Sequence, residues 1–385
     1  MKKAAFISFL CVYAGIVFFA CKKDAKSVDQ QVYSSTPTLP DQPYDYVQSN
    51  NDMKAALGRV LFYDKNLSLN GSVSCASCHQ QVKAFTDNMQ FSSGLEDYKT
   101  TRNTPSIFAK NGRMFWDGRA SGFNELALRP IKNHVEMGFT NIQGLVTKLK
   151  GISYYPALFN SAYGTSTIDT LAIQSALAEF LINFNFSNNK FNRSLDNIEQ
   201  LSASEKLGKD IFFGKGVCSR CHHLEDGGMG NGYGFADGDF NIGLDENYKD
   251  KGIGDLVNSS DKSGNFMAPV LLNVEYTSPY MHDGRFKTLE EVVEHYNSGI
   301  KNNSNLDVNL RDLSSLDGKT EEEIFALLDK NHNGDIDNEE VALLPPLRLN
   351  LTSVEKKCLV DFLKTLSDGS ILIDKRFNNP FVITK

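Results

Sequence analysis

The pattern of hydrophobic and polar positions divides the chain into an apolar start, a polar segment and a long globular remainder. Two lysines precede the apolar run 4–20, which is too short to span a bilayer comfortably, and Cys21 opens the polar stretch CKKDAKS. This order is typical of a bacterial lipoprotein signal, so we expect a signal peptide over 1–20 and lipidation of Cys21. A plain signal peptide or an uncleaved anchor is the alternative. The polar residues 21–48, which include STPTLPDQP, predict a disordered tether.

In the globular part, the apolar spacing indicates helices. Leu57, Val60 and Leu61 lie at helical intervals, and SVEKKCLVDFLKTL near the end of the chain is also helical in pattern. The stretch SASE, residues 202–205, supplies a capping box for a third helix. In the second of these segments we expect Cys358 to be a buried structural thiol.

Composition places the chain among mildly acidic globular proteins. Its 385 residues predict two domains of ordinary size, and the net charge of −7 gives no reason to expect a nucleic-acid partner. An exported chain with seven cysteines could contain disulfides. However, four of the seven form two closely spaced pairs, each followed directly by a histidine.

The two cysteine pairs belong to the motifs CASCH and CSRCH. Both read C-x-x-C-H, the attachment signature of c-type haem, in which two thiols bond the vinyl groups and the histidine ligates iron. A redox dithiol would not need the histidine twice, and a zinc site would need a second ligand pair nearby. We therefore predict two covalent c-type haems, held by Cys75, Cys78, His79, Cys218, Cys221 and His222.

The motifs lie within a longer internal repeat. LGRVLFYDKNLSLNGSVSCASCH matches LGKDIFFGKGVCSRCH, RNTPSIF parallels MAPVLLN, and WDGR parallels HDGR. Each half is therefore expected to be a small helical haem domain. The boundaries follow as 49–198 for the first domain, 199–372 for the second and 373–385 for a tail.

The motifs SCASCH, AFTD, RNTPS, FWDGRA, VEMG, CSRCH and SPYMHDGRF…VVEHYN resemble the bacterial di-haem cytochrome c peroxidase family, which includes the MauG-type enzymes. The resemblance runs from about residue 50 to about 372, apart from one insertion. It implies a mainly α fold, a tandem of two cytochrome c-like domains whose haems face a shared interface. It also implies reduction of hydrogen peroxide to water, with electrons from a redox protein such as a small cytochrome or a cupredoxin.

A haem that reduces peroxide needs one open axial position, and the first half fits that requirement. No histidine lies between His79 and His134, and Pro130, which cannot bind iron, stands at the repeat position of Tyr296. In the stretch AFTDNMQFSSGLEDYKTT ahead of RNTPS, Met89 is the one conventional ligand candidate, and we interpret it as a core residue. The first haem is therefore expected to be five-coordinate.

The resemblance implies two catalytic residues in the first half. Glu136 of VEMG is the acid–base residue that moves a proton between the peroxide oxygens, with a surface charge as the alternative. Trp116, the sole tryptophan, is the aromatic bridge between the haems, with core packing as the alternative. Leu126 replaces a glutamine common in the family, which removes one distal hydrogen bond. His134 could compensate.

For the second haem, the resemblance implies a filled distal position. Residue 296 is tyrosine, as in MauG-type proteins, where the peroxidases have methionine. The iron ligands are therefore expected to be His79, His222 and Tyr296. The adjacent His295 is the alternative to Tyr296, because two neighbouring helical side chains point about 100° apart and only one can face the iron.

Calcium is expected at two places. The resemblance implies an interdomain ion held by Asn103 and by the backbone oxygens of Thr277 and Pro279. An insertion at about 311–344 contains DKNHNGDIDNEE, which matches the calcium loop of an EF-hand, with an acidic turn as the alternative. The predicted ligands of that loop are Asp329, Asn331, Asn333, Asp335, Asp337 and Glu340. A single hand of this kind favours a structural clamp over a sensor.

Two other functions remain open at this point. One is a MauG-type oxidase that acts through a high-valent state on a protein or organic substrate, and Tyr296 favours it. The other is a di-haem electron carrier without substrate chemistry, which a filled first haem would favour. In every case the signal predicts the cell envelope, as a periplasmic protein or an outer-membrane lipoprotein held to the membrane by its lipid anchor.

Overall fold

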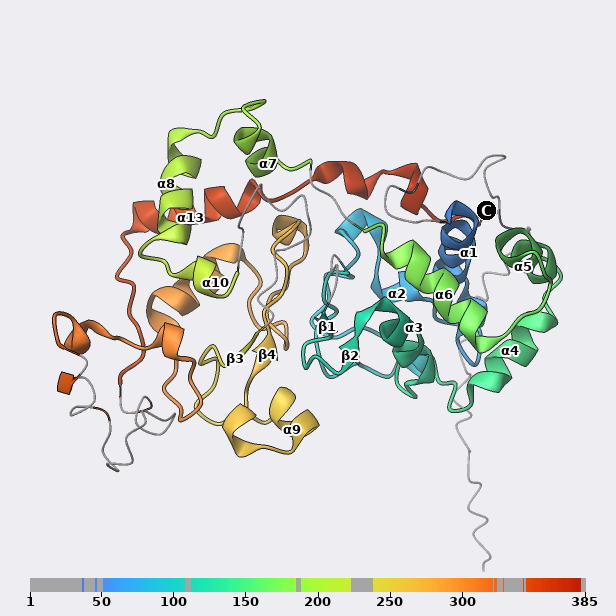
Figure 1. Cartoon of the computed structure of the whole chain (residues 1–385), viewed down its shortest axis with the longest axis horizontal. Coiled ribbons are helices and arrows are strands. Elements are labelled where there is room, and N and C mark those ends of the chain that lie inside the picture. The colour runs from blue at the N-terminus through green and yellow to red at the C-terminus, as the bar shows by residue number, and fades with distance from the viewer. Residues whose placement is uncertain are drawn as a thin grey trace, which may run out of the picture. The chain divides into compact units, whose positions relative to one another are not determined.

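A computed structural model describes residues 37, 46, 51–107, 112–184, 188–222, 238–320, 322–323, 328, 342 and 344–381 (Figure 1). The predicted signal peptide, Cys21 and the calcium loop 329–340 lie outside these residues, as does nearly all of the predicted tether. None of the described helices is both long enough and apolar enough to cross a membrane.

The described chain is mainly helical, which confirms the predicted fold class. The helices of the first half are α1 (Asp52–Tyr63), α2 (Cys75–Cys78), α3 (Gly122–Lys132), α4 (Ile142–Lys150), α5 (Tyr155–Tyr163), α6 (Thr170–Leu181) and α7 (Lys190–Leu195). Those of the second half are α8 (Ala203–Phe213), α9 (Ile253–Val257), α10 (Leu289–Glu294), the π-helical turn η8 (His295–Gly299) and α13 (Ser353–Lys364).

Short elements connect these helices. The 3-10 turns are η1 (Lys65–Leu67), η2 (Gln81–Lys83), η3 (Leu95–Asp97), η4 (Cys218–Arg220), η6 (Ser260–Lys262), η7 (Val274–Tyr276), η9 (Val308–Leu310), η10 (Ser314–Leu316), η11 (Gly369–Leu372) and η12 (Lys375–Phe377). Strands form two antiparallel pairs, β1 (Arg113–Met114) with β2 (Ala120–Ser121) and β3 (Asp239–Phe240) with β4 (Phe266–Met267).

The helix signals of the sequence are confirmed. Leu57, Val60 and Leu61 are buried on α1. Ser202 and Glu205 form the expected capping box at the start of α8, with each side chain bound to the other residue's backbone N–H. Cys358 is buried on α13, as expected of a structural thiol.

The same helix-to-helix contact occurs in both halves. In the first half α1 packs on α6, and in the second α8 packs on α13 (Figure 1). A Cβ atom built on Gly58 of α1 would collide with the carbonyl oxygen of Ala176, and one built on Gly208 of α8 would collide with that of Cys358. Both glycines occupy the LGR/LGK position of the repeat, so the duplication extends to a close approach of two backbones that only glycine permits.

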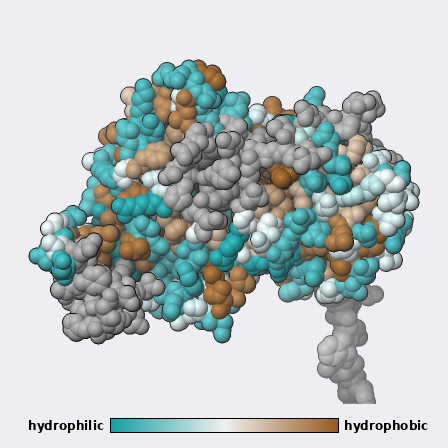
Figure 2. All heavy atoms as spheres, viewed as in Figure 1, coloured by the Kyte–Doolittle hydropathy of each residue, from teal (hydrophilic) through white to brown (hydrophobic). Residues whose placement is uncertain are grey.

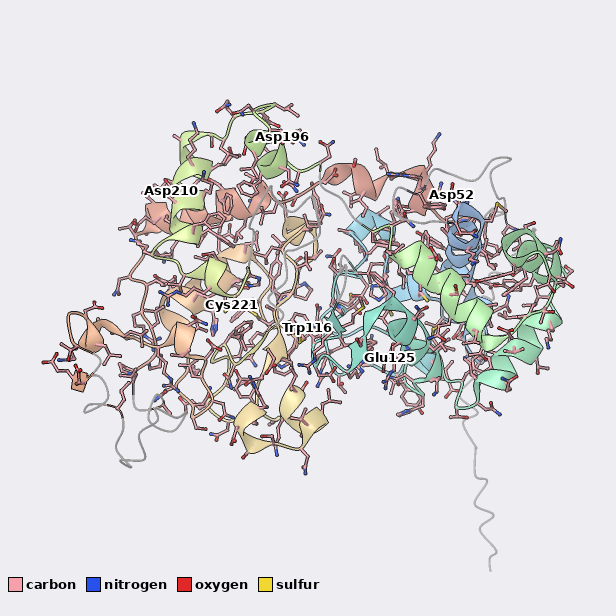
Figure 3. All side chains as sticks on the ribbon, in the orientation of Figure 1. Asp52, Trp116, Glu125, Asp196, Asp210 and Cys221 are labelled. Carbon is pink, nitrogen blue, oxygen red and sulfur yellow. The ribbon has the colours of Figure 1, made fainter. Side chains whose placement is uncertain are left out.

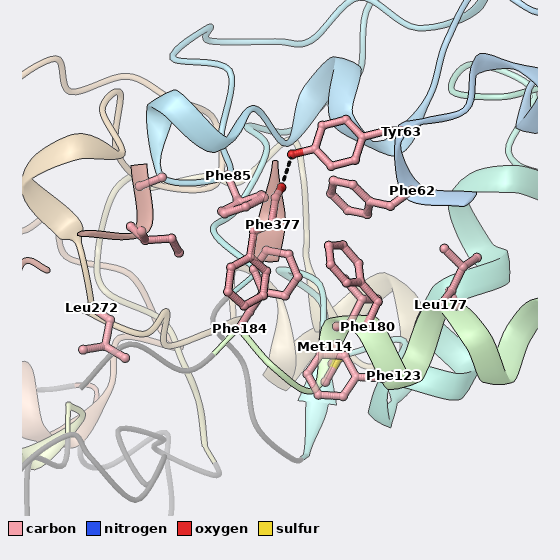
Figure 4. Packing of buried hydrophobic residues seen from close by; sticks show 14 of the residues in the cluster. Phe62, Tyr63, Phe85, Met114, Phe123, Leu177, Phe180, Phe184, Leu272 and Phe377 are labelled. Carbon is pink, nitrogen blue, oxygen red and sulfur yellow. Dashed lines mark hydrogen bonds between the residues drawn. The ribbon is translucent and has the colours of Figure 1, made fainter. Parts of the chain in front are cut away.

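The core of the first half is rich in aromatic side chains (Figure 4). Phe62, Phe85, Phe180 and Phe184 pack largely edge to face or tilted, with ring centroids 4.4–6.2 Å apart. Phe377 joins them with 1% of its surface exposed, although it comes from the segment expected to be a tail. The chain therefore returns to its first half after α13.

The surface is mixed, and one expected core residue lies on it. On the face in Figure 2, hydrophobic side chains of the described residues form separate groups among hydrophilic ones. Met89 is 52% exposed, so the expectation that it is a core residue is wrong. It lies in a loop where Asn88 has φ +54° and the Asp87 carboxylate accepts the N–H of Met89, an arrangement that turns the side chain outward.

We predict that the two close helix contacts cannot accept a methyl group. Gly58→Ala or Gly208→Ala should lower the free energy of unfolding by about 1–3 kcal/mol or more, because a backbone oxygen cannot move aside as a flexible side chain would. Gly144→Ala in α4 is the matched control, since its added methyl makes only ordinary contact with Phe139 and alanine favours helix. Chemical denaturation of the haem-loaded protein measures all three, and similar losses throughout would contradict the prediction.

Candidate active site

The first haem-attachment motif presents two free thiols. Cys75 and Cys78 begin and end α2, which starts with a capping box between Ser74 and Ser77. The two cysteines are not joined to each other or to another cysteine. Burial raises the pKa of each thiol to about 12. The pair therefore consists of neutral S–H groups, which can add to the vinyl groups of a haem.

His79 is oriented by a neighbouring backbone carbonyl. Its Nδ1 donates a hydrogen bond of 2.8 Å to the carbonyl oxygen of Phe85. Burial lowers the pKa of His79, partly offset by that bond, so the ring is neutral. A neutral imidazole that donates from Nδ1 keeps the lone pair of Nε2 for a metal, and the first motif therefore fits a haem iron.

The second motif repeats this arrangement with different partners. Cys218 and Cys221 are unbridged, and burial raises the pKa of both thiols to about 12. His222 donates from Nδ1 to the carbonyl oxygen of Pro269 at 3.1 Å. Each half thus offers two neutral thiols and an imidazole held through Nδ1, which is the donor set that a covalent haem requires.

Glu136 lies beside the first motif. Its Oε1 accepts a 2.7 Å hydrogen bond from the side-chain amide of Asn133. Burial raises the pKa of this carboxyl above its ordinary value, opposed by the charge of Arg119 and by the bond from Asn133. Burial is the main cause of the raised pKa of Cys75 and Cys78, and the charge of Glu136 adds a smaller contribution to both.

The other distal residues of the first half take simpler places. His134 is exposed, whereas Leu126 packs against the hydrophobic core. Pro130 lies within α3. Of these three, none places a nitrogen or sulphur donor in the interior of the first half.

Trp116 lies in the turn between β1 and β2 and connects the two halves. Its indole Nε1 donates to the backbone oxygen of Asn103 at 2.9 Å, and its own backbone oxygen accepts from the N–H of Met267 at 2.8 Å. It is half-buried, and Figure 3 labels it where the first half approaches β4. Trp116 therefore lies where the two halves meet.

A second backbone bond mirrors the one to Trp116. The N–H of Asn103 donates to the backbone oxygen of His282 at 2.7 Å. When the repeats are aligned on the prolines of RNTPS and MAPV, Asn103 corresponds to Met267, and when they are aligned on WDGR and HDGR, Trp116 corresponds to His282. The two halves therefore exchange equivalent hydrogen bonds, one in each direction.

Arg102 reinforces this exchange. It binds Asp117 at 2.5 Å and the carboxylate of Asp250 through two nitrogens at 2.7 and 2.8 Å. Although burial opposes ionisation, the hydrogen bonds and charge of Arg102 lower the pKa of both carboxyls. The guanidinium also lies over the ring of Phe266, which stacks on the ring of His282 at 3.7 Å.

Tyr296 and His295 have different surroundings. Burial, followed by the nearby Cys221 and Cys218, raises the pKa of the Tyr296 phenol well above its ordinary value. His295 instead donates from Nε2 to the backbone oxygen of Ile242 at 2.9 Å, and burial lowers its pKa to about 4. Tyr296 thus lies beside the second cysteine pair, whereas the Nε2 of His295 is engaged elsewhere.

The residues expected for the interdomain calcium lie in neighbouring loops. The side-chain nitrogen of Asn103 donates to the backbone oxygen of Met89. Asn88 donates to the backbone oxygens on either side of Thr277, those of Tyr276 and Ser278. In the part of the chain that the structure describes, no three or more His, Cys, Asp or Glu side chains gather into a metal site.

Sequence reasoning missed several residues that position this site. Arg102 opens the RNTPS motif, which offered a signal, but its partner Asp250 lies 148 positions away in a segment without a motif. Asn133, which holds Glu136, precedes VEMG and carried no independent signal.

We predict that Arg102 stabilises the contact between the halves. Arg102→Gln should lower the free energy of unfolding by about 1–3 kcal/mol, less than for a fully buried pair because these groups are partly exposed. The lowered pKa values of Asp117 and Asp250 add stability above the ordinary carboxyl pKa of about 3.9. That contribution disappears as the pH falls through the lowered folded-state values. The variant should therefore lose less stability on acidification.

Denaturant unfolding at several pH values measures this effect. Arg113→Gln is the control, because Arg113 meets Asp239 at 3.5 Å with a more exposed side chain. The free energy of unfolding of Arg113→Gln should differ from that of the parent by less than about 1 kcal/mol. Equal effects of the two substitutions across the pH range would contradict the assignment.

Comparisons with known proteins identify the family. A sequence model described as di-haem cytochrome c peroxidase matches residues 52–200. The methylamine utilization protein MauG of Methylophilus methylotrophus is 34% identical over 253 residues, 64% of this chain and 72% of its own. The cytochrome c551 peroxidase of Nitrosomonas europaea is 32% identical over 262 residues, 66% and 76% of the two chains.

Solved structures extend the comparison to nearly the whole chain. A MauG-like protein associated with microbial copper homeostasis matches with a TM-score of 0.69 and 30% identity, over 91% of this chain and 98% of its own. The diheme peroxidase BthA of Burkholderia thailandensis shares the fold, with a TM-score of 0.63, 21% identity, and coverage of 82% and 86%. The chain therefore belongs to the di-haem cytochrome c peroxidase family that includes MauG.

Proposed function

We propose that the protein is a di-haem peroxidase that reduces hydrogen peroxide to water with electrons from an external redox protein. The observation that carries the proposal is Glu136, a half-buried carboxyl that is held by Asn133 and whose charge acts on Cys75 and Cys78. His79, with Cys75 and Cys78, would hold a haem whose iron would supply the site for peroxide and for electrons. Overall, one peroxide, two protons and two electrons give two molecules of water.

The protein's part in this reaction is to move one proton and guide the substrate. Asn133 holds Oε1 of Glu136, so Oε2 is the oxygen that takes a proton from the inner peroxide oxygen. Glu136 then returns that proton to the outer oxygen, which leaves as water. The raised pKa of Glu136 suits the uptake step, because it makes the carboxylate a stronger base than an exposed one.

Electron supply is assigned to the second half. Cys218, Cys221 and His222 would hold the haem that receives electrons from the donor, and Trp116 connects that half to the first through its bonds to Met267 and Asn103. A small cytochrome or a cupredoxin has the required chemistry.

Tyr296 favours a second candidate, a MauG-type oxidase of a protein or organic substrate. A phenol whose pKa is raised by burial ionises only against a positive partner, and ferric iron between Tyr296 and His222 would be that partner. An electron carrier without substrate chemistry has less support, because Glu136 would then have no role beside the first motif.

Calcium and membrane attachment complete the proposal. Asn103 can turn its amide oxygen to an ion because its nitrogen is bound to Met89, and the backbone oxygens of Thr277 and Pro279 would add hard donors. The sequence 329–340 supports a second calcium site in the insertion. The signal ending before Cys21 supports export and a lipid anchor in the cell envelope.

We predict that Glu136→Gln slows peroxide reduction by about two to four orders of magnitude, the usual effect of removing a general acid–base group. Because only the ionised carboxyl accepts a proton, the parent's rate should rise with pH through the pKa of Glu136, above the ordinary value of about 4.3. This rise of the rate with pH should be absent in Glu136→Gln. It should persist in His134→Gln, which is the control. Steady-state turnover against pH measures both, and an unchanged rate in Glu136→Gln would contradict the assignment.

We predict that Tyr296, not His295, ligates the second haem. Tyr296→Phe should change the low-spin absorption spectrum of that haem, and Tyr296→Met should raise its reduction potential, because thioether sulphur stabilises ferrous iron. His295→Ala should leave the spectrum unchanged, since Nε2 of His295 is bound to Ile242. The opposite pattern of spectral change would transfer the ligand role to His295 and remove the main support for the MauG-type alternative.

A further inference from the structure

The segment 371–377, which we call the C-terminal strap, follows the second half in sequence but binds the first half. Gln81 donates from Nε2 to the backbone oxygens of Ile371 at 2.8 Å and Asp374 at 2.7 Å. Two further side chains of the first half donate to strap carbonyls, Arg59 to Lys375 at 3.1 Å and Tyr63 to Phe377 at 2.5 Å, and Tyr46, which precedes the first half, donates to Arg376 at 3.1 Å. These side chains thus bind the main chain of the strap.

One strap side chain enters the core of the first half. The ring of Phe377 lies 4.9 Å from that of Phe184, 5.9 Å from Phe180 and 6.4 Å from Phe85, measured between centroids (Figure 4). Phe85 and Phe184 are themselves in T-shaped contact at 4.4 Å. Phe377 therefore helps to fix the position of Phe85.

These contacts converge on the turn that orients His79. Gln81 follows His79 by two residues, and the backbone oxygen of Phe85 accepts the hydrogen bond from Nδ1 of His79. In this turn, Ala84 and Phe85 are consecutive non-glycine residues in the left-handed region, with φ of +50° and +60°. Such a conformation persists only where surrounding contacts hold it. Here the strap supplies contacts at both ends of the turn, through Gln81 and through the Phe85 ring.

We propose that the C-terminal strap positions the proximal ligand of the first haem, with Gln81 and Phe377 as its positioning residues. A hydrogen bond from Nδ1 to a carbonyl increases the electron density of the imidazole and so favours ferric over ferrous iron. The strap keeps the Phe85 oxygen aimed at Nδ1 and thereby holds the first haem at a lower reduction potential. This inference rests on haem binding at His79, and it is independent of peroxide turnover.

The test is a spectroelectrochemical titration of the full-length haem-loaded protein. Gln81→Ala and Phe377→Ala should each shift the equilibrium of the first haem towards ferrous by about tenfold, which is about 59 mV for a one-electron couple. The second haem should stay at the parent's potential. The transition of the first haem is identified by its absence from a Cys75→Ala, Cys78→Ala variant.

Two controls separate positioning from general stability. Ile373→Ala changes a strap side chain that is 82% exposed, and Phe377→Leu keeps an apolar side chain in the core, so both should stay near the parent's potential. If Gln81→Ala and Phe377→Ala lower the melting temperature but leave the first haem's potential unchanged, the strap is only structural and the proposal is wrong. If Phe377→Ala fails to fold, Gln81→Ala decides alone, because it leaves the aromatic core intact.

Discussion

The exchange of backbone hydrogen bonds between the two repeats is the constraint on which the rest of the site depends. Asn103 donates to His282 in one direction and Met267 donates to Trp116 in the other. Because main-chain groups make both bonds, side-chain changes at these positions leave the bonds in place. Arg102 also forms ion pairs with a carboxylate of each half, which add to the contact made by the two backbone bonds. Trp116 consequently connects the halves through a fixed backbone frame.

A shared frame allows the two halves to differ in chemistry. Both halves keep the glycine at the helix contact, the paired thiols and the histidine held through Nδ1. They differ in the residues that we propose for the distal side of each haem, with Pro130 and Glu136 in the first half and Tyr296 in the second. An arrangement with one site for a substrate and one for an electron suits an oxidoreductase better than two equal sites would. The proposed calcium ion would add to the same contact between halves.

Local and periodic features were predictable from the sequence, whereas long-range pairings were not. The C-x-x-C-H motifs, the helix spacing of α1 and the capping box of α8 depend on neighbouring residues, so a short window contains the whole signal. The pairing of Arg102 with Asp250 joins residues 148 positions apart, and Phe377 lies in the polar stretch DKRFNNP, which gives no sign of burial. Met89 was assigned to the core on residue type, yet local loop geometry turns it outward.

We propose that one duplicated frame holds two unlike haem sites, one open and one closed. Low-temperature electron paramagnetic resonance of the fully ferric protein tests this claim most directly, because a five-coordinate haem is high-spin and a haem with two strong axial ligands is low-spin. We predict one high-spin and one low-spin signal that integrate to equal amounts of iron. Two low-spin signals would contradict the account, since they would mean that both haems are closed to peroxide.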